Sequence, residues 1–151
     1  MFKKRKTIKQ VEEGNELAPK FDQNGFIPVV TTDAKSGIVL MHAYMNDEAL
    51  KKTIATKEAH YYSRSRKCIW HKGDTSGFVQ KIDNILIDDD QDCIWLKVTV
   101  EGNASCHVGY YSCFYREIKY DGKDAKLVFT EKEKVFDPED VYGDAPNPTI
   151  L

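Results

Sequence analysis

The sequence predicts an α+β fold, with a largely antiparallel β-sheet and one prominent helix. Short runs of β-branched and aromatic residues alternate with turns rich in Gly, Asp and Ser. One stretch near residue 50 carries helix signals at both ends. Asp121-Gly122 is a dipeptide typical of a tight hairpin. The 151 residues are enough for one domain with a core and too few for two comfortable ones.

The strands of the predicted sheet are apolar runs bounded by turn residues. Residues 26–32 and 38–44 are separated by DAKSG, whose Ser and Gly suit a short turn, so they predict a hairpin. Further strands are expected at residues 78–87, 93–100, 113–120 and 126–130.

The helix is predicted to begin after Asn46. The Asn46 side chain can cap the helix, and Asp47 and Glu48 place negative charge in its first turn. Met45 and Leu50 occupy the two positions of a hydrophobic staple.

The composition excludes a general attraction to polyanions. Lys and Arg number 22 against 24 Asp and Glu, a formal charge of −2, so neither nucleic acid nor a membrane is expected as a partner. Residues 1–20 are charged without an apolar run, and we expect them to form a solvated arm or a partly ordered lead-in on a cytoplasmic protein. The proline-rich residues 137–151 are expected to be irregular. Because the cysteines cluster near Asp and His, we expect reduced thiols.

Three aspartates, Asp88, Asp90 and Asp92, alternate along the chain before the run at 93–100. On an extended chain their side chains project to one face. Three carboxylates held that close repel each other unless a cation neutralises them, and ligation by oxygen alone suits Mg²⁺. The alternative is a solvated acidic end of a strand, and the residues favour neither.

A second group of candidate ligands is Cys106, His107 and Cys113. Thiolate and imidazole are ligands that zinc prefers, and a catalytic zinc needs only three protein ligands. The sequence has no C-x-x-C pair to complete a structural site. Either the cysteines are buried core thiols, or further ligands come from elsewhere, such as another subunit.

Residues 60–72 combine aromatic rings with basic side chains. Arg64, Arg66 and Lys72 are suited to phosphate groups, with Thr75 and Ser76 of the following loop. The same segment is suited to RNA by stacking and charge, and an ordinary basic surface is the third alternative.

Four stretches together resemble the phosphoribosyl-AMP cyclohydrolase family. They are MNDEALKKTIATKEAHYYSRSR (45–66), WHKGDTSG (70–77), DDDQDCIWLKV (88–98) and SCHVGYYSCFYR (105–116). The similarity runs over residues 21–143, the expected cyclohydrolase domain, between the arm at 1–20 and a tail at 144–151. The chain resembles the single-function form, without the pyrophosphohydrolase domain that some organisms fuse to it.

The resemblance implies hydrolytic opening of the adenine ring at the N1–C6 bond of N1-(5-phosphoribosyl)-AMP, the third step of histidine biosynthesis. It also implies an obligate homodimer in which both subunits contribute zinc ligands. His107 would be the general acid/base. Zinc would be held by Cys106 and Cys113, and Mg²⁺ by Asp88, Asp90 and Asp92.

Asp89 departs from the family pattern, which usually has a zinc-binding cysteine there. A cysteine occurs instead at Cys93, but four residues of strand separate the two by roughly 13 Å. Either Asp89 binds zinc through oxygen, or an irregular strand brings Cys93 to the metal, or zinc binding and activity are impaired or lost. We expect Asp89 to be the ligand, because carboxylate binds zinc at a similar distance. Tyr110 is a smaller departure, because Arg is common there.

Overall fold

The computed structural model describes residues 1–102 and 104–151. Its strands are β1 (Ile27–Asp33), β2 (Val39–Met45), β3 (His60–Ser63), β4 (Cys68–His71), β5 (Gln80–Ile87), β6 (Ile94–Val100), β7 (Arg116–Tyr120) and β8 (Ala125–Phe129). Its helices are α1 (Ile8–Glu13), α2 (Asp47–Thr56) and α3 (Pro138–Tyr142). The predicted α+β class is confirmed. In the described part, no helix has the length and apolar character needed to cross a membrane.

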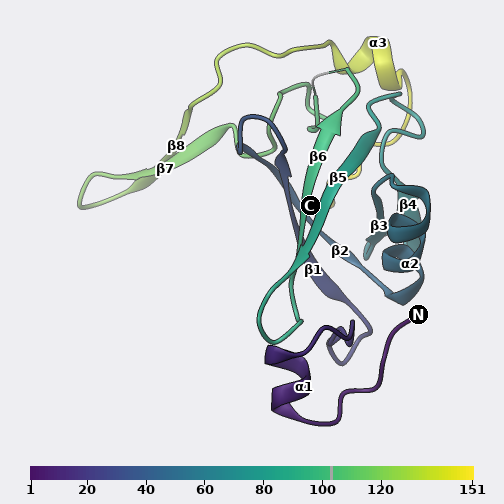
Figure 1. Ribbon diagram of the computed structural model, residues 1–151. Helices are drawn as coiled ribbons and strands as arrows, with labels where there is room; N and C mark the ends of the chain where they lie inside the picture. The colour runs from purple at the N-terminus through teal and green to yellow at the C-terminus, as the bar shows by residue number, and fades with distance from the viewer. Residues whose placement is uncertain (103) are drawn as a thin grey trace.

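The central sheet has the strand order β2-β1-β6-β5 (Figure 1). The pairs β1–β2 and β5–β6 are antiparallel, as predicted, whereas β1 and β6 are parallel. Parallel neighbours need a long connection, and here the chain from β2 to β5 supplies it. The hairpins β3–β4 and β7–β8 form two further antiparallel sheets.

Helix α2 begins where the sequence predicts. Asn46 is its N-cap, and its Oδ1 accepts a hydrogen bond from the N–H of Ala49 at 2.8 Å. Asp47 lies in the first turn and pairs with Lys51 one turn later, at 2.6 Å. The helix ends at Lys57, which is left-handed with φ 60° and donates its N–H to the carbonyl of Thr53.

The hydrophobic core lies between the central sheet, α2 and β3. In β6 the alternating residues Ile94, Leu96 and Val98 are buried, and Trp95 between them is exposed. Tyr61 of β3 is fully buried. The remaining members are Ile27, Val29, Leu40, Met41, Met45, Ala49, Leu50 and Ala59.

Both ends of the chain are more ordered than expected. Residues 1–20 contain α1, and Val11 and Ala18 are buried, so the solvated arm is wrong and the alternative of a partly ordered lead-in fits this segment. The C-terminal segment contains α3, which Asp137 caps and Pro138 begins, where an irregular chain was expected. In both cases the helix is short, and short helices leave little periodicity in a sequence.

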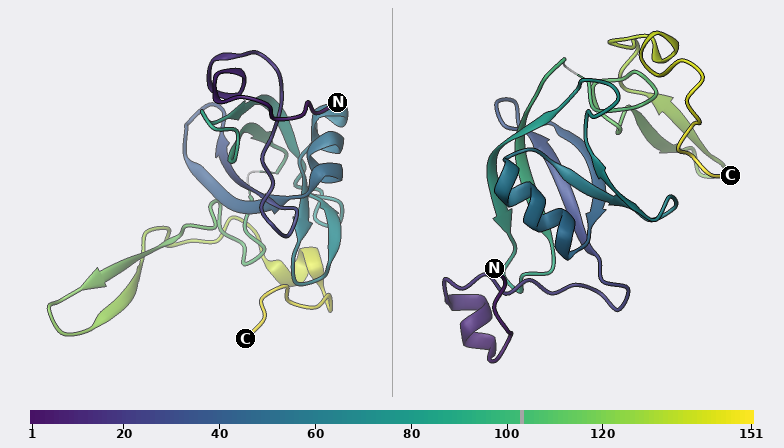
Figure 2. Two further views of the ribbon diagram at one scale, coloured as in Figure 1. Left: turned by 90° about the horizontal axis from the view of Figure 1, so that it is seen from below. Right: turned by 90° about the vertical axis from the view of Figure 1, so that its right-hand side faces the viewer.

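The β7–β8 hairpin projects away from the central sheet (Figures 1 and 2). Both strands are exposed along their length, and their apolar side chains include Ile118, Leu127 and Phe129.

Candidate active site

A loop after β6 brings two thiols together. The N–H of Cys106 donates to the carbonyl of Tyr110 at 3.3 Å, which closes a turn. The N–H of Cys113 donates to the carbonyl of Leu40 in β2 at 2.7 Å, which fixes the other end of the loop on the central sheet. A hydrogen bond from the Cys113 thiol lowers the pKa of Cys106 to about 6 and raises the pKa of Cys113. One thiol of the pair therefore ionises readily.

Lys72 lies beside this pair. Its side chain is buried, and its Nζ donates to the carbonyl of Ser105 at 2.8 Å. Burial lowers the pKa of Lys72, while the nearby Cys113 and Cys106 oppose that shift. Sequence reasoning placed Lys72 among phosphate-binding residues, whereas the structure places it next to the thiols.

His107 follows Cys106 and is half-buried. Its Nε2 is buried and, among the described residues, has no hydrogen-bond partner. A buried ring nitrogen without a partner is costly in an ordinary core. Burial lowers the pKa of His107 and the charge of Lys72 lowers it further, while a hydrogen bond with Asn147 opposes them. The imidazole is therefore predominantly neutral near pH 7.

The small-residue loop after β4, residues 73–77, lies next to the C-terminal segment, where Ser76 and Tyr142 are in hydrogen-bond contact. Gly73 has φ 91°, and a Cβ there would approach the backbone nitrogen of Val79 to 2.4 Å, so this position requires glycine. Ser76 is half-buried and its Oγ accepts the N–H of Phe78 at 3.1 Å. Thr75 is exposed. Both hydroxyls stay candidates for phosphate binding.

Arg64 and Arg66 lie on the turn of the β3–β4 hairpin and are exposed. The Arg64 guanidinium stacks over the ring of Tyr44 at 4.0 Å, and that of Arg66 lies 5.8 Å from the ring of Trp70. Stacking leaves the edge of a guanidinium free to bind phosphate. In the described part of the chain, no hydrogen bond or ion pair connects these two side chains with Cys106 or Cys113.

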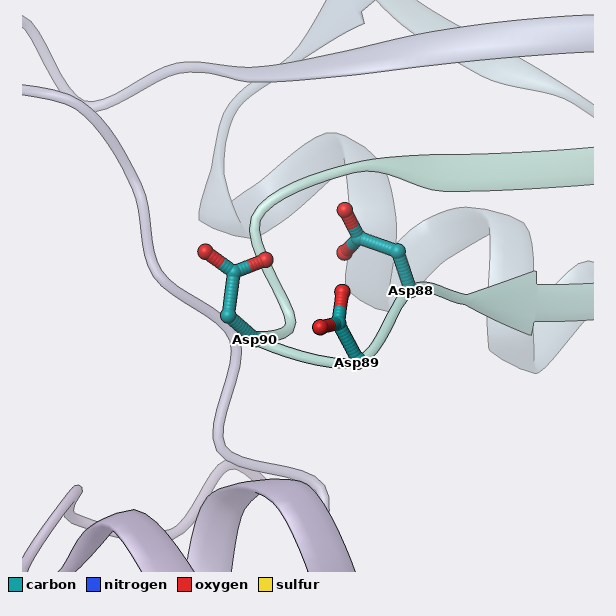
Figure 3. Close-up of side chains that lie close together, drawn as sticks. All are labelled: Asp88, Asp89 and Asp90. Carbon is teal, nitrogen blue, oxygen red and sulfur yellow. The ribbon is translucent and has the colours of Figure 1, made fainter.

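Residues 88–92, called the acidic turn below, form a turn between β5 and β6. The expectation that they are extended is therefore wrong. Asp88, Asp89 and Asp90 point their carboxyl groups to the same side of this turn (Figure 3), with one oxygen of each within 4.8 Å of the others. The expected face of Asp88, Asp90 and Asp92 assumed strict alternation, which the left-handed residue Gln91, at φ 57°, breaks.

Asp88 organises the turn. Its Oδ1 accepts the N–H groups of Asp92 and Cys93, both at 2.9 Å. Burial acts to raise the pKa of Asp88, but these bonds outweigh it and lower the pKa. The pKa of Asp92 is raised by burial and by its closeness to Asp88 and Asp90. The turn therefore concentrates negative charge that a cation would stabilise.

The acidic turn and the loop that carries Cys106 and Cys113, called the thiol loop below, lie at opposite ends of β6. The turn precedes Ile94 and the loop follows Val100, at the two ends of β6 (Figure 1). A strand of seven residues spans about 20 Å. Among the described residues, Asp88, Asp89 and Asp90 are the one group of three candidate ligand side chains in mutual reach. Neither Asp89 nor Cys93 completes a three-ligand site with Cys106 and Cys113 within one chain.

Sequence reasoning missed two residues that hold the acidic turn. Gln91 is 5% exposed, and its side chain makes hydrogen bonds to the N-terminal segment. The Arg5 guanidinium reaches the carbonyl of Asp90 at 2.9 Å. Gln91 is a neutral amide among four carboxylates, which indicated that its role differs from theirs. Nothing in the sequence linked it to a segment more than 70 residues away.

Comparison with known proteins identifies the family. The family model of phosphoribosyl-AMP cyclohydrolase matches residues 41–115. The chain is 55% identical over 134 residues to a phosphoribosyl-AMP cyclohydrolase of Rhodopseudomonas palustris strain TIE-1, covering 88% of this chain and 89% of the relative. It is 50% identical to the protein of that name from Bradyrhizobium diazoefficiens, over 88% and 94% of the two chains. With that from Nitrobacter winogradskyi, identity is 49% over 91% and 94%. The chain therefore belongs to the phosphoribosyl-AMP cyclohydrolase family.

Proposed function

We propose that the protein hydrolyses the N1–C6 bond of N1-(5-phosphoribosyl)-AMP in histidine biosynthesis. The observation that carries the proposal is the Cys106–Cys113 pair beside the unpartnered Nε2 of His107, in a chain of this family. The reaction adds water to C6 and breaks the C6–N1 bond. The water oxygen becomes the carboxamide oxygen, and N1 leaves as a protonated amidine nitrogen.

The residues fit the two ions that the family implies. Cys106 ionises readily and Cys113 lies in hydrogen-bond contact with it, which is the soft donor pair that zinc favours. The carboxylates of Asp88, Asp90 and Asp92 are the proposed Mg²⁺ ligands, because carboxylate oxygens are the hard donors that this ion prefers. Oxygens of Asp88 and Asp90 lie within 4.8 Å of each other, and Asp92 adds charge next to them. When bound, the two ions supply Lewis acidity that makes water a nucleophile at neutral pH and positive charge that complements phosphates.

His107 is proposed to move the proton. Its neutral imidazole can accept a proton at Nε2 from the attacking water and return it to N1 as the C6–N1 bond breaks. Lys72 is proposed to supply fixed positive charge next to the thiols. Arg64 and Arg66, with Thr75 and Ser76, remain the proposed ligands of the two substrate phosphates.

We further propose a homodimer in which the acidic turn of one subunit completes the thiol site of the other. Two observations support it: the length of β6 separates the two ligand groups within a chain, and a pair of thiols alone is one ligand short of a catalytic zinc site. Asp89 of the turn is the proposed third ligand, with Cys93 as the alternative. A closed twofold dimer would form two equivalent sites.

The test is turnover of N1-(5-phosphoribosyl)-AMP by purified protein, together with its zinc content. We expect turnover that a chelator removes and added zinc restores, and about one zinc per subunit. His107→Ala should abolish turnover and keep the zinc, and Cys106→Ser should lose both. Cys68→Ser, on the exposed face of β4, is the matched control and should change neither. Full activity of metal-free protein would refute the mechanism.

A second possibility is a family member that binds metal and nucleotide but has lost this reaction, which the replacement of cysteine by Asp89 favours. The same assay separates the two. Zinc and substrate binding without turnover, restored by Asp89→Cys, would establish the second.

A further inference from the structure

The N-terminal segment, residues 1–20, makes hydrogen bonds to the acidic turn. Gln91 is buried, although Asp88 and Asp89 of the same turn are exposed and its immediate neighbours Asp90 and Asp92 are half-buried. Its φ of 57° is left-handed, which an amino acid with a side chain adopts rarely. Other contacts must therefore hold this conformation.

The polar groups of Gln91 supply these contacts. Its Oε1 accepts the N–H of Ala18 at 2.8 Å, and its Nε2 donates to the carbonyls of Val11 at 3.0 Å and Glu16 at 3.2 Å. Its own carbonyl accepts the N–H of Lys20 at 2.7 Å. Every one of these partners belongs to residues 1–20. The side chain of Gln91 therefore binds the N-terminal segment and does not compete for the cation that the carboxylates would take.

Arg5 makes a second connection. Its guanidinium donates to the carbonyl of Ala18 at 2.7 Å and to that of Asp90 at 2.9 Å, so one side chain joins the segment to the turn. It also brings a positive charge to the backbone of a turn that carries four carboxylates.

The segment is itself anchored, so it can hold the turn. Thr7 and Gln10 form a capping box at the start of α1, and Val11 is buried. Near the N-terminus, the ring of Phe2 packs against Phe21 at 6.1 Å. Figure 2 shows α1 lying at the end of the molecule where the β5–β6 turn is found.

We propose that the N-terminal segment is a positioning element for the acidic turn, and that Gln91 and Arg5 are its positioning residues. They hold Asp88, Asp89 and Asp90 with their carboxyl groups gathered, in the absence as in the presence of metal. The part of this inference that concerns cation affinity rests on the proposed function. The part that concerns the conformation of the turn does not.

The experiment compares Gln91→Ala and Arg5→Gln with wild-type full-length protein, and Lys9→Ala, on the exposed face of α1, is the matched control. Hydrogen exchange of residues 88–93 is measured without metal, and Mn²⁺ is titrated as a spectroscopic probe of the turn. We expect faster exchange in both variants and an affinity for Mn²⁺ about tenfold weaker in Gln91→Ala, as is typical when a residue that orients metal ligands is lost. Thermal stability measured in parallel separates a local change from general unfolding.

The outcomes are distinct. Unchanged exchange in 88–93 for both variants refutes the positioning role, whatever happens to activity. If wild-type protein binds no Mn²⁺ at the turn, with Asp90→Asn as the check, the cation site of the proposed function fails. The positioning role is then decided by exchange alone. If Gln91→Ala does not fold, Arg5→Gln, which replaces one guanidinium by an amide at a half-buried position, supplies the same two measurements.

Discussion

Two inactive variants should restore each other's activity if the site is shared between subunits. Asp89→Ala removes the proposed ligand on the acidic turn, and Cys106→Ala removes a ligand on the thiol loop. Because β6 keeps the turn and the loop about 20 Å apart within a chain, each variant damages a different half of every site. In a hybrid dimer, one site carries both changes and the other carries neither.

The expected recovery follows from counting sites. Equal amounts of the two variants, unfolded and refolded together, give about half hybrid dimers, and each hybrid has one intact site of two, so activity should reach about a quarter of wild type. Differently tagged subunits allow the hybrid to be purified and its turnover and zinc content measured directly. Cys106→Ala mixed with Cys113→Ala is the matched control, because both changes fall on the same half-site and no recovery is expected.

Two results would refute the reasoning. The first is no recovery in a hybrid dimer whose formation is verified. The second, an Asp89→Ala protein that keeps its zinc and activity while Cys93→Ala loses both, would refute Asp89 as the third ligand and make Cys93, at the same end of β6, the ligand instead. The ranking we expect is a larger loss of zinc affinity for Asp89→Ala than for Cys93→Ala.

Three further predictions concern stability. Asn46→Ala removes the cap of α2 and should lower the free energy of unfolding by about 1 kcal/mol, measured by urea denaturation. Tyr61→Phe leaves Thr31 and Gln80 without the buried hydroxyl that each contacts, so it should cost about 1–3 kcal/mol, and a neutral effect would show that water replaces the hydroxyl. Burial, followed by the charge of His71, lowers the pKa of His60. As pH falls below about 6.5, His60 therefore takes up a proton in the unfolded chain before it does so in the folded chain. Protonation favours the unfolded state, so the free energy of unfolding decreases on acidification. His60→Gln should reduce the loss in melting temperature between about pH 7.5 and about pH 5.5, and an unchanged loss would assign it to other groups.

Local signals account for the parts of the fold that were predicted correctly. The Asn46 cap, the acidic first turn and the β-branched runs are each encoded within a few residues, and the structure has an element at each of them. The parallel pairing of β1 with β6 was not predictable in this way. It joins residues more than 60 positions apart, and neither strand carries a mark of its partner.

The candidate site was likewise predictable in its local features and not in its tertiary arrangement. The residue types that suit zinc and Mg²⁺ were visible in the sequence, because ligand chemistry depends on side-chain identity. Their arrangement was not, because a single left-handed residue, Gln91, turns the acidic block away from the strand geometry assumed for it. Lys72 shows a further limit. Its charge suggested phosphate binding, which stays a prediction, but nothing in the sequence indicated that tertiary packing would bury it beside Cys106.

The replacement of cysteine by aspartate at position 89 affects the proposed Mg²⁺ site as well as the proposed zinc site. Asp89 lies within ligand reach of Asp88 and Asp90, so in one subunit the proposed third zinc ligand belongs to the same oxygen cluster as the proposed Mg²⁺ ligands. A thiolate there would be a poor ligand for Mg²⁺, and would keep the two metal sites chemically distinct. A carboxylate can serve either ion. If Asp89 binds metal as proposed, we expect the direction in which its carboxylate points, rather than its chemistry, to decide which ion it takes. The segment that holds the turn through Gln91 and Arg5 would then influence that choice.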